Sequence, residues 1–484
     1  MRYAPAELSP AQFRAIGHDL VDRIADFLAT VADRPVAPDT SPSAIRALLG
    51  ASDMVPTNGE DPAAVVRQSA QLLFDHSTFN GHPRFFGYIT SSAAPIGALA
   101  DLLAASVNAN CGAWGLSPVA TEIERQSVRW IAQLIRYPAD CGGILVSGGN
   151  MANMVCLLAA IRAQAGPEKR ASGLSASRSL RVYASGEVHT WLQKAADICG
   201  IGTNAVRSVP VDRSLAMDVK QLARLIANDR AVGHTPAVVI GTAGSVSTGA
   251  IDPLKEIAAL CKREKLWFHV DGAYGAPAAM LDDAPAALRA LSLADSVAVD
   301  PHKWLYSPIE AGCALVRRPE HLHETFVFHP PYYAFEGDAQ DPPTNFHEWG
   351  PQNSRGFRAL KVWMTIRQVG REGYMRMIAD DIALARELHA LTAKHDELEA
   401  LTCSLSIATF RYIPKGKDLS DEELNVLNSA ILARLQREGA VYLSNAVIGG
   451  RFALRACVVN FRTTSSDVRA LVEAAVTAGR AVSS

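Results

Sequence analysis

Residues 237–274 read AVVIGTAGSVSTGAIDPLKEIAALCKREKLWFHVDGAY and predict a strand, a helix and a second strand. Apolar residues dominate 237–241 and 266–270, whereas apolar positions recur every three or four residues over 253–263. Strands that are apolar throughout are typical of a parallel sheet buried on both faces. The segment therefore predicts a mostly parallel sheet with helices on both faces.

The same alternation extends in both directions along the chain. Further strands are predicted at 144–146, 181–184, 296–299 and 313–316, and helices are predicted to begin at 118, 150 and 189. Beyond about residue 380 a smaller α+β unit follows, with helical patterns at 382–391, 424–435 and 468–476 and strand-like runs at 404–412 and 452–459. We therefore expect an α/β fold with an N-terminal helical arm over 1–80, a large α/β domain over 81–380 and a small α+β domain over 381–484.

The N-terminal arm begins with an amphipathic helix over 13–28, for which Ser9 and Pro10 supply an N-cap and a first-turn proline. A proline-dotted stretch and a short helical pattern at 45–49 follow it. These elements are too few to form a core. The apolar face of the helix needs a partner, either the rest of the chain or a second subunit.

Composition excludes several classes of protein. The 484 residues carry 47 basic and 49 acidic side chains, so the net charge of −2 offers no broad basic surface for nucleic acid. No apolar run reaches the ~20 residues that span a bilayer, and residues 1–15 lack the pattern of a signal peptide. The eight cysteines form no C-x-x-C pair, which favours a reduced compartment. We expect a cytoplasmic protein that binds neither membrane nor nucleic acid.

Four segments with candidate functional residues follow predicted strands, where a doubly wound sheet places its ligands. They are Ser147-Gly148-Gly149-Asn150, Gly241-Thr242-Ala243-Gly244, His269-Val270-Asp271-Gly272-Ala273-Tyr274 and Asp300-Pro301-His302-Lys303-Trp304.

Each segment taken alone has an ordinary explanation. The paired glycines at a helix start can cradle a phosphate or can form a plain tight turn. Asp271 can be a helix cap or half of an ion pair, and His302 with Lys303 can be a solvated pair at a strand end. Together, a phosphate cradle, a strand-end carboxylate and a lysine at one sheet edge match the requirements of pyridoxal phosphate. The lysine forms a Schiff base with the cofactor aldehyde, and the carboxylate keeps the ring nitrogen protonated.

The two motifs His-Val-Asp-x-Ala-Tyr and Asp-Pro-His-Lys-Trp, in this order, identify a resemblance. From about residue 81 to the C-terminus the chain resembles the group II pyridoxal-phosphate amino-acid decarboxylases, closest to the aromatic-L-amino-acid decarboxylase branch. The resemblance implies the fold type I of these enzymes, which is aspartate-aminotransferase-like. It also implies a homodimer with active sites at the interface.

Residue roles follow from this resemblance. Lys303 is expected to be the Schiff-base lysine, Asp271 the partner of the pyridine nitrogen and His189 the imidazole stacked on the ring. Without the family match, His189 reads as a helix-start histidine with no special role. The remaining cofactor contacts are assigned to Ala273 beneath the ring and, around the phosphate and ring substituents, to Thr242, Asp300, His302 and the backbone of Gly148 and Gly149. Relatives commonly carry asparagine where this chain has Asp300.

A proline-rich segment over 328–345 reads as a mobile loop of the kind that covers active sites. By similarity, Tyr332 corresponds to the tyrosine that protonates the substrate carbon after carbon dioxide leaves, with Tyr333 as the alternative in register. The two tyrosines can instead anchor the loop. A tyrosine favours simple decarboxylation over oxidative aldehyde formation.

The substrate pocket is assigned by similarity to Tyr88, Ser91, Gly112 and Trp114. Gly112 stands where the animal enzymes usually carry phenylalanine, so a missing ring is expected to enlarge the pocket. No arginine is evident for an acidic substrate. We expect an aromatic L-amino acid substrate: tryptophan, tyrosine, phenylalanine or dihydroxyphenylalanine.

Three alternatives remain open. The enzyme can be a pyridoxal-phosphate decarboxylase of non-aromatic amino acids or an aldehyde synthase. More remotely, it can be a nicotinamide-dependent oxidoreductase, because residues 200–205 have G-x-G-x-x-A spacing. These residues follow a predicted helix, however, whereas a dinucleotide fingerprint follows a strand. His321, His323 and Glu324 read as a solvated turn, and we expect no metal.

Overall fold

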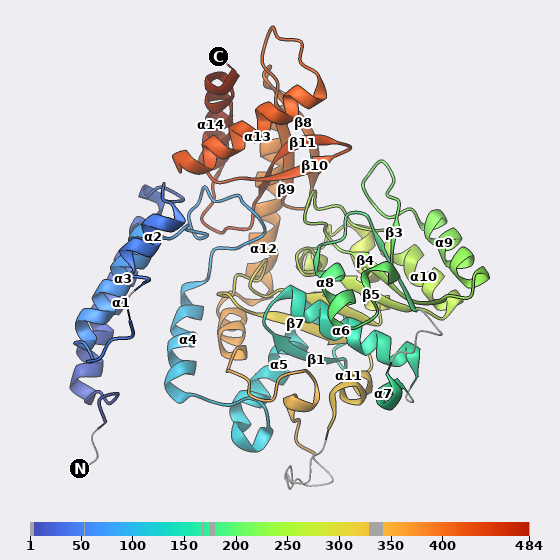
Figure 1. Ribbon diagram of the computed structural model, residues 1–484, viewed down its shortest axis with the longest axis horizontal. Helices are drawn as coiled ribbons and strands as arrows, with labels where there is room; N and C mark the ends of the chain where they lie inside the picture. The colour runs from blue at the N-terminus through green and yellow to red at the C-terminus, as the bar shows by residue number, and fades with distance from the viewer. Residues whose placement is uncertain (1–3, 53, 167–168, 174–179, 329–341, 484) are drawn as a thin grey trace.

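A computed structural model describes residues 4–52, 54–166, 169–173, 180–328 and 342–483. A seven-stranded sheet forms the centre of the molecule, and a four-stranded sheet lies beside it under the C-terminal helices (Figure 1). The large sheet has the order β1-β7-β6-β5-β4-β2-β3, and the small sheet has the order β10-β11-β9-β8. The predicted α/β fold with a small α+β unit is confirmed.

The strands of the large sheet are β1 (Gly142–Val146), β2 (Leu180–Ser185), β3 (Val206–Val209), β4 (Thr235–Thr242), β5 (Trp267–Asp271), β6 (Ser296–Val299) and β7 (Gly312–Val316). The small sheet contains β8 (Leu398–Ser404), β9 (Ile407–Tyr412), β10 (Ser444–Ile448) and β11 (Arg451–Cys457). Only β7 runs antiparallel to its neighbours in the large sheet, whereas the small sheet is antiparallel throughout.

The described helices, in chain order, are α1 (Pro10–Thr30), α2 (Pro42–Leu48), α3 (Pro62–His76), α4 (Pro95–Val107), α5 (Pro118–Leu134), α6 (Gly149–Ala165), α7 (Lys169–Ser172), α8 (Trp191–Ile198), α9 (Val219–Ala231), α10 (Leu254–Glu264), α11 (Pro319–Phe326), α12 (Ala359–Ala393), α13 (Asp421–Glu438) and α14 (Ser465–Ser483). Within the described chain, none of them combines the length and hydropathy needed to cross a membrane.

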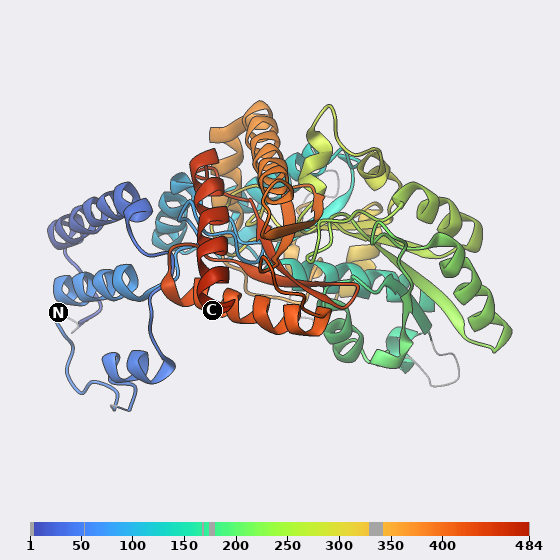
Figure 2. The ribbon, with the colours of Figure 1, turned by 90° about the horizontal axis from the view of Figure 1, so that it is seen from above.

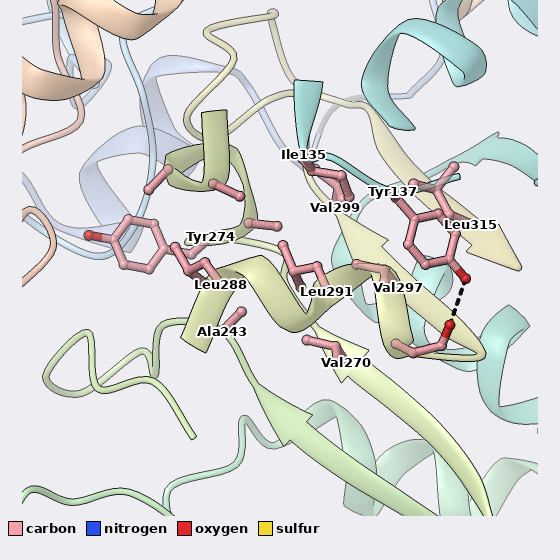
Figure 3. Packing of buried hydrophobic residues seen from close by; sticks show 14 of the residues in the cluster. Ile135, Tyr137, Ala243, Val270, Tyr274, Leu288, Leu291, Val297, Val299 and Leu315 are labelled. Atoms are coloured by element: carbon pink, nitrogen blue, oxygen red, sulfur yellow. Dashed lines mark hydrogen bonds between the residues drawn. The ribbon is translucent and has the colours of Figure 1, made fainter. Parts of the chain in front are cut away.

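Helices cover both faces of the large sheet because alternate strand residues point to opposite sides. One face packs Val239, Phe268 and Leu315 against α5, α9, α10 and α12. The other face packs Val238, Trp267 and Val316 against α6, α8 and α11. Figure 3 shows part of the first core, where Tyr137 donates a hydrogen bond of 3.0 Å to the carbonyl of Ala294.

The N-terminal arm lies at the edge of the molecule in both views (Figures 1 and 2). Ser9 caps α1 as predicted, and its side chain accepts a hydrogen bond from the Gln12 amide. Phe27 of α1 stacks on Phe74 of α3 with ring centroids 4.6 Å apart. No residue of α1 is buried, so the apolar face of this helix finds little cover within its own chain.

Helix α12 links the two sheets. It packs against α4 and α5 beside the large sheet and against β8 and β9 of the small one. The domain boundary that the sequence predicts near residue 380 falls inside this helix, which kinks at Gly370, where φ is +66°.

Candidate active site

The carboxyl ends of β1, β4, β5 and β6 meet at one edge of the large sheet, around a cavity of about 460 Å³. Tyr88 lines this cavity. So does every residue assigned to the cofactor from sequence: Gly148, Gly149, His189, Thr242, Asp271, Ala273, Asp300, His302 and Lys303. The four segments that follow predicted strands therefore all contribute residues to one cavity.

Asp271 is the last residue of β5 and is 8% exposed. Its carboxylate accepts hydrogen bonds from Trp191 Nε1 at 2.7 Å and from the Ala273 amide at 3.2 Å. These donors hold the side chain in place at the cavity wall. A buried carboxylate of this kind suits a cationic partner such as a protonated ring nitrogen. Sequence reasoning missed Trp191, although its place two residues after His189 was a usable signal.

Lys303 follows β6 on a tight turn in which its backbone amide donates to the Asp300 carbonyl at 2.9 Å. Its Nζ lies 3.1 Å from Asp300 Oδ2. His302 holds its ring through a 2.7 Å contact between Nδ1 and the Ala311 carbonyl, and its Nε2 faces Asp300 Oδ2 at 3.8 Å. The turn thus presents the lysine amine to the cavity, next to a buried carboxylate.

His189 precedes α8, and its Nδ1 accepts a hydrogen bond from the Trp191 amide at 3.2 Å. Burial lowers the pKa of His189, although the nearby Asp271 carboxylate opposes that shift. The imidazole is therefore neutral at pH 7, with its proton on Nε2. A neutral imidazole at the cavity wall is suited to stacking on a flat heterocycle.

The anion-binding end of the cavity forms where β1 leads into α6. Gly148 has a φ of +91°, which favours glycine, and Gly149 begins a helix of 17 residues. The amides at the start of this helix point toward the cavity edge and favour an anion. Thr242 ends β4 beside Asp271 and also lines the cavity, where its Oγ1 is buried without a hydrogen-bond partner among the described residues. The amides at a helix start are donors of the kind that a phosphate requires, so this turn fits a phosphorylated cofactor.

The predicted substrate residues separate into two groups. Tyr88 lines the cavity, and Ser91 lies behind it, where its hydroxyl donates to the His302 carbonyl at 2.8 Å. Gly112 and Trp114 do not line the cavity of their own chain; Trp114 lines a separate surface groove with Glu122.

The expectation that Gly112 enlarges the pocket is wrong within a single chain. A Cβ built at Gly112 would lie 2.1 Å from the backbone carbonyl of Asn353. The glycine is therefore required by close backbone packing and opens no space for a ring. Tyr332 and Tyr333 lie outside the described residues.

Two other sequence motifs, residues 200–205 and the histidines His321 and His323, do not line this cavity. Residues 200–205 lie between α8 and β3, so the strand that should precede a dinucleotide fingerprint is missing. His321 packs edge-on against Trp267 with ring centroids 5.2 Å apart, and His323 pairs with Glu348 at 3.6 Å.

The segment after Lys303 is joined to the small domain by hydrogen bonds that sequence reasoning also missed. Trp304 stacks on Tyr274 with centroids 4.9 Å apart, and its Nε1 donates to Asp381 Oδ2 of α12 at 2.8 Å. The hydroxyl of Tyr306 donates to the same oxygen. Asp381 is 2% exposed, and burial raises its pKa to about 7.

Asp381 predicts a pH dependence of stability. Its folded pKa of about 7 exceeds the ~3.9 of an unfolded aspartate, so the folded protein holds an extra proton between these values. The stabilising contribution is complete below about pH 4 and falls as pH rises through the folded pKa. In Asp381→Asn this fall is absent. From about pH 4 to pH 8 the free energy of unfolding of the variant, relative to wild type, should rise by up to about 4 kcal/mol.

Urea unfolding of both proteins across this pH range measures the effect. The exposed Asp418→Asn serves as a control and should track wild type at every pH. Parallel pH profiles for Asp381→Asn and wild type would contradict the assignment of a raised pKa.

Comparisons with known proteins agree with this geometry. Residues 42–413 match the model of the pyridoxal-dependent decarboxylase conserved domain. An aromatic-L-amino-acid decarboxylase of Bacillus atrophaeus is 32% identical over 96% of this chain and 94% of its own length. A phenylacetaldehyde synthase of a Rosa hybrid cultivar is 28% identical over 96% and 93%. The crystal structure of Oryza sativa TDC with PLP and tryptamine superposes with a TM-score of 0.91 at 27% identity, covering 99% of each chain.

The fold and the comparisons define an enzyme that uses pyridoxal phosphate (PLP). The chain belongs to the pyridoxal-dependent decarboxylase family, in its group II branch, and is a PLP-dependent amino-acid decarboxylase.

Proposed function

We propose that this enzyme decarboxylates an aromatic L-amino acid to the amine and carbon dioxide. The observation that carries the substrate class is the charge of the cavity wall. Lys303 is the only lysine or arginine among the lining residues in the described ranges, whereas Glu187, Asp271, Asp300 and Glu310 also line the cavity. An acidic substrate side chain would meet these carboxylates without a cation of its own, which is costly in a confined site.

Apolar and aromatic side chains complete the wall and support the same substrate class. Tyr88, Ile89, Val246 and Ile309 line the cavity, and Tyr88 and Ile309 expose 58% and 60% of their surface. Glu310 of the cavity wall forms an ion pair with Arg358 at 2.8 Å. An aromatic ring can pack on these side chains, which are well suited to planar apolar groups.

We assign the catalytic roles as follows. Lys303 carries the cofactor through its amine and moves protons to and from the substrate. Asp271 holds a proton at the ring nitrogen, and His189 stacks on the ring. When bound, PLP supplies an electron sink for the bond to the departing carboxylate. The phosphate and ring substituents are held by Thr242, Asp300, His302 and the backbone of Gly148 and Gly149. Ala273 packs beneath the ring, and Tyr332 donates the final proton to the substrate carbon.

We also propose that the enzyme is a cytoplasmic homodimer. Helix α1 buries none of its residues, and α4 exposes about half of the surface of Leu99, Leu102 and Leu103. Apolar faces of this size favour a protein partner. Gly112 and Trp114, which lie outside the cavity of their own chain, belong in this proposal at the interface between subunits. All eight cysteines are free, which supports a reducing compartment.

A panel of amino acids tests the substrate class. The holoenzyme is incubated with phenylalanine, tyrosine, tryptophan, dihydroxyphenylalanine, glutamate and histidine, and amines and aldehydes are both quantified. Amine from one or more aromatic substrates, in equal amount to carbon dioxide, is expected. Turnover of glutamate or histidine alone would contradict the substrate class, and aldehyde in place of amine would identify an aldehyde synthase.

A further inference from the structure

Asp300 places a buried negative charge at the anion-binding end of the cavity. The residue is 1% exposed, and its Oδ1 has no hydrogen-bond partner among the described residues. Its Oδ2 lies 3.1 Å from the Lys303 amine, and a Cβ built on Gly149 would meet the same oxygen at 2.5 Å. The carboxylate therefore lies against the first residue of α6, where the phosphate is assigned.

In this arrangement the carboxylate is stabilised by two positive neighbours, the Lys303 ammonium and the N-terminal end of the α6 dipole. A phosphate bound at the same helix end would compete for both. Two anions that share a desolvated site cannot both stay fully ionised, because each raises the proton affinity of the other. The unpaired Oδ1 offers a place for a proton.

We propose that Asp300 takes up one proton from solvent when the phosphate of the cofactor binds, so that cofactor binding weakens as pH rises. The neutral carboxylic acid then donates its proton toward a phosphate oxygen in place of repelling it. This inference rests on the proposed assignment of the phosphate to the Gly148–Gly149 turn. An asparagine at position 300 would need no proton and would bind the phosphate with less dependence on pH.

The other titratable groups that face Asp300 do not replace it in this role. Lys303 and His302 lie on its own turn, His189 precedes α8 and Cys313 belongs to β7. Burial raises the pKa of the Cys313 thiol and lowers the pKa of His189, so both are neutral near pH 7. All four groups are retained in Asp300→Asn, and the difference between the two proteins isolates the carboxylate.

Inorganic phosphate is the direct probe, because it enters the anion site without reacting with Lys303. Its binding to the cofactor-free enzyme is measured by titration calorimetry in two buffers of different ionisation enthalpy, which counts the protons taken up. At about pH 8, where phosphate groups carry nearly two charges, Asp300→Asn should bind about tenfold more tightly, or ~1.4 kcal/mol. It should also take up about one proton fewer than wild type.

The same comparison with PLP gives a second readout, in which the pH dependence of the dissociation constant should flatten in Asp300→Asn. The exposed Asp283→Asn is the control and should match wild type. Equal phosphate affinity and equal proton uptake in Asp300→Asn and wild type would overturn the proposal. Wild type alone also tests it, since phosphate binding at about pH 8 without proton uptake is incompatible with it.

Failure of the site assignment gives a different result. Borohydride reduction of wild-type holoenzyme followed by peptide mapping reports whether the cofactor lies at Lys303. An adduct elsewhere refutes the site and the inference with it, whereas an adduct at Lys303 with unchanged phosphate binding in Asp300→Asn refutes the inference alone.

Discussion

Replacement of Lys303 by alanine is expected to lower turnover by at least about 10³-fold, within the range for loss of a positioned proton-transfer group. The amine of Lys303 is the only one from a lysine or arginine that lines the cavity in the described chain, so no neighbour can substitute for it. The variant should still bind PLP non-covalently, because the phosphate donors and Asp271 remain. Steady-state amine formation and absorption spectra before and after borohydride treatment measure both effects.

Lys255→Ala is the matched control, since Lys255 is exposed on α10 far along the chain from the turn that holds Lys303. It should retain wild-type turnover and wild-type spectra. Activity of Lys303→Ala within tenfold of wild type would remove the lysine from the mechanism.

Asp271→Asn is expected to reduce turnover by about 10²–10³-fold, as for removal of one preorganised electrostatic group. Asparagine has nearly the same shape and can still accept the hydrogen bond from Trp191, so the local fold should survive. Without the negative charge, however, nothing at this wall holds a proton on the ring nitrogen. The loss should fall on the turnover number rather than on substrate binding, because the charge acts on the reacting state.

The exposed Asp283→Asn should leave turnover unchanged. Restored charge in Asp271→Glu should recover part of the activity if the electrostatic role is correct. A large rise in the Michaelis constant of Asp271→Asn with an unchanged turnover number would instead indicate a role in binding alone.

The predictable part of the site follows from topology. Parallel strands end at a common sheet edge, so the segments after β4, β5 and β6 could be placed together before their contacts were known. The assignment of Lys303 to a turn at this edge required only that its strand and the strand of Asp271 be neighbours, and β5 pairs with β6 in parallel.

Contacts made by residues distant in sequence could not be predicted in this way. The bond from Trp304 to Asp381 joins residues 77 positions apart, and from sequence Asp381 is an ordinary residue just before a helical pattern. The close approach of Gly112 to Asn353 is also invisible in sequence, so the packing that requires a glycine within this chain could not be expected. The ion pair between Lys303 and Asp300 could have been predicted from sequence, because both residues lie on one turn.

Several secondary-structure elements were also missed for physical reasons. Helix α4 carries apolar residues on most of its surface, so it shows little helical periodicity. Strand β3 has only four residues, and β10 alternates buried and exposed positions at an edge of the small sheet. Short edge strands gain their stability from pairing with neighbours, which local sequence does not encode.

Peptide mapping of the borohydride-reduced holoenzyme tests the central claim most directly, because it locates the covalent link between protein and cofactor. The account predicts a single cofactor adduct on the peptide that contains Lys303. An adduct on any other lysine, or a reduced protein that carries no cofactor, would contradict it.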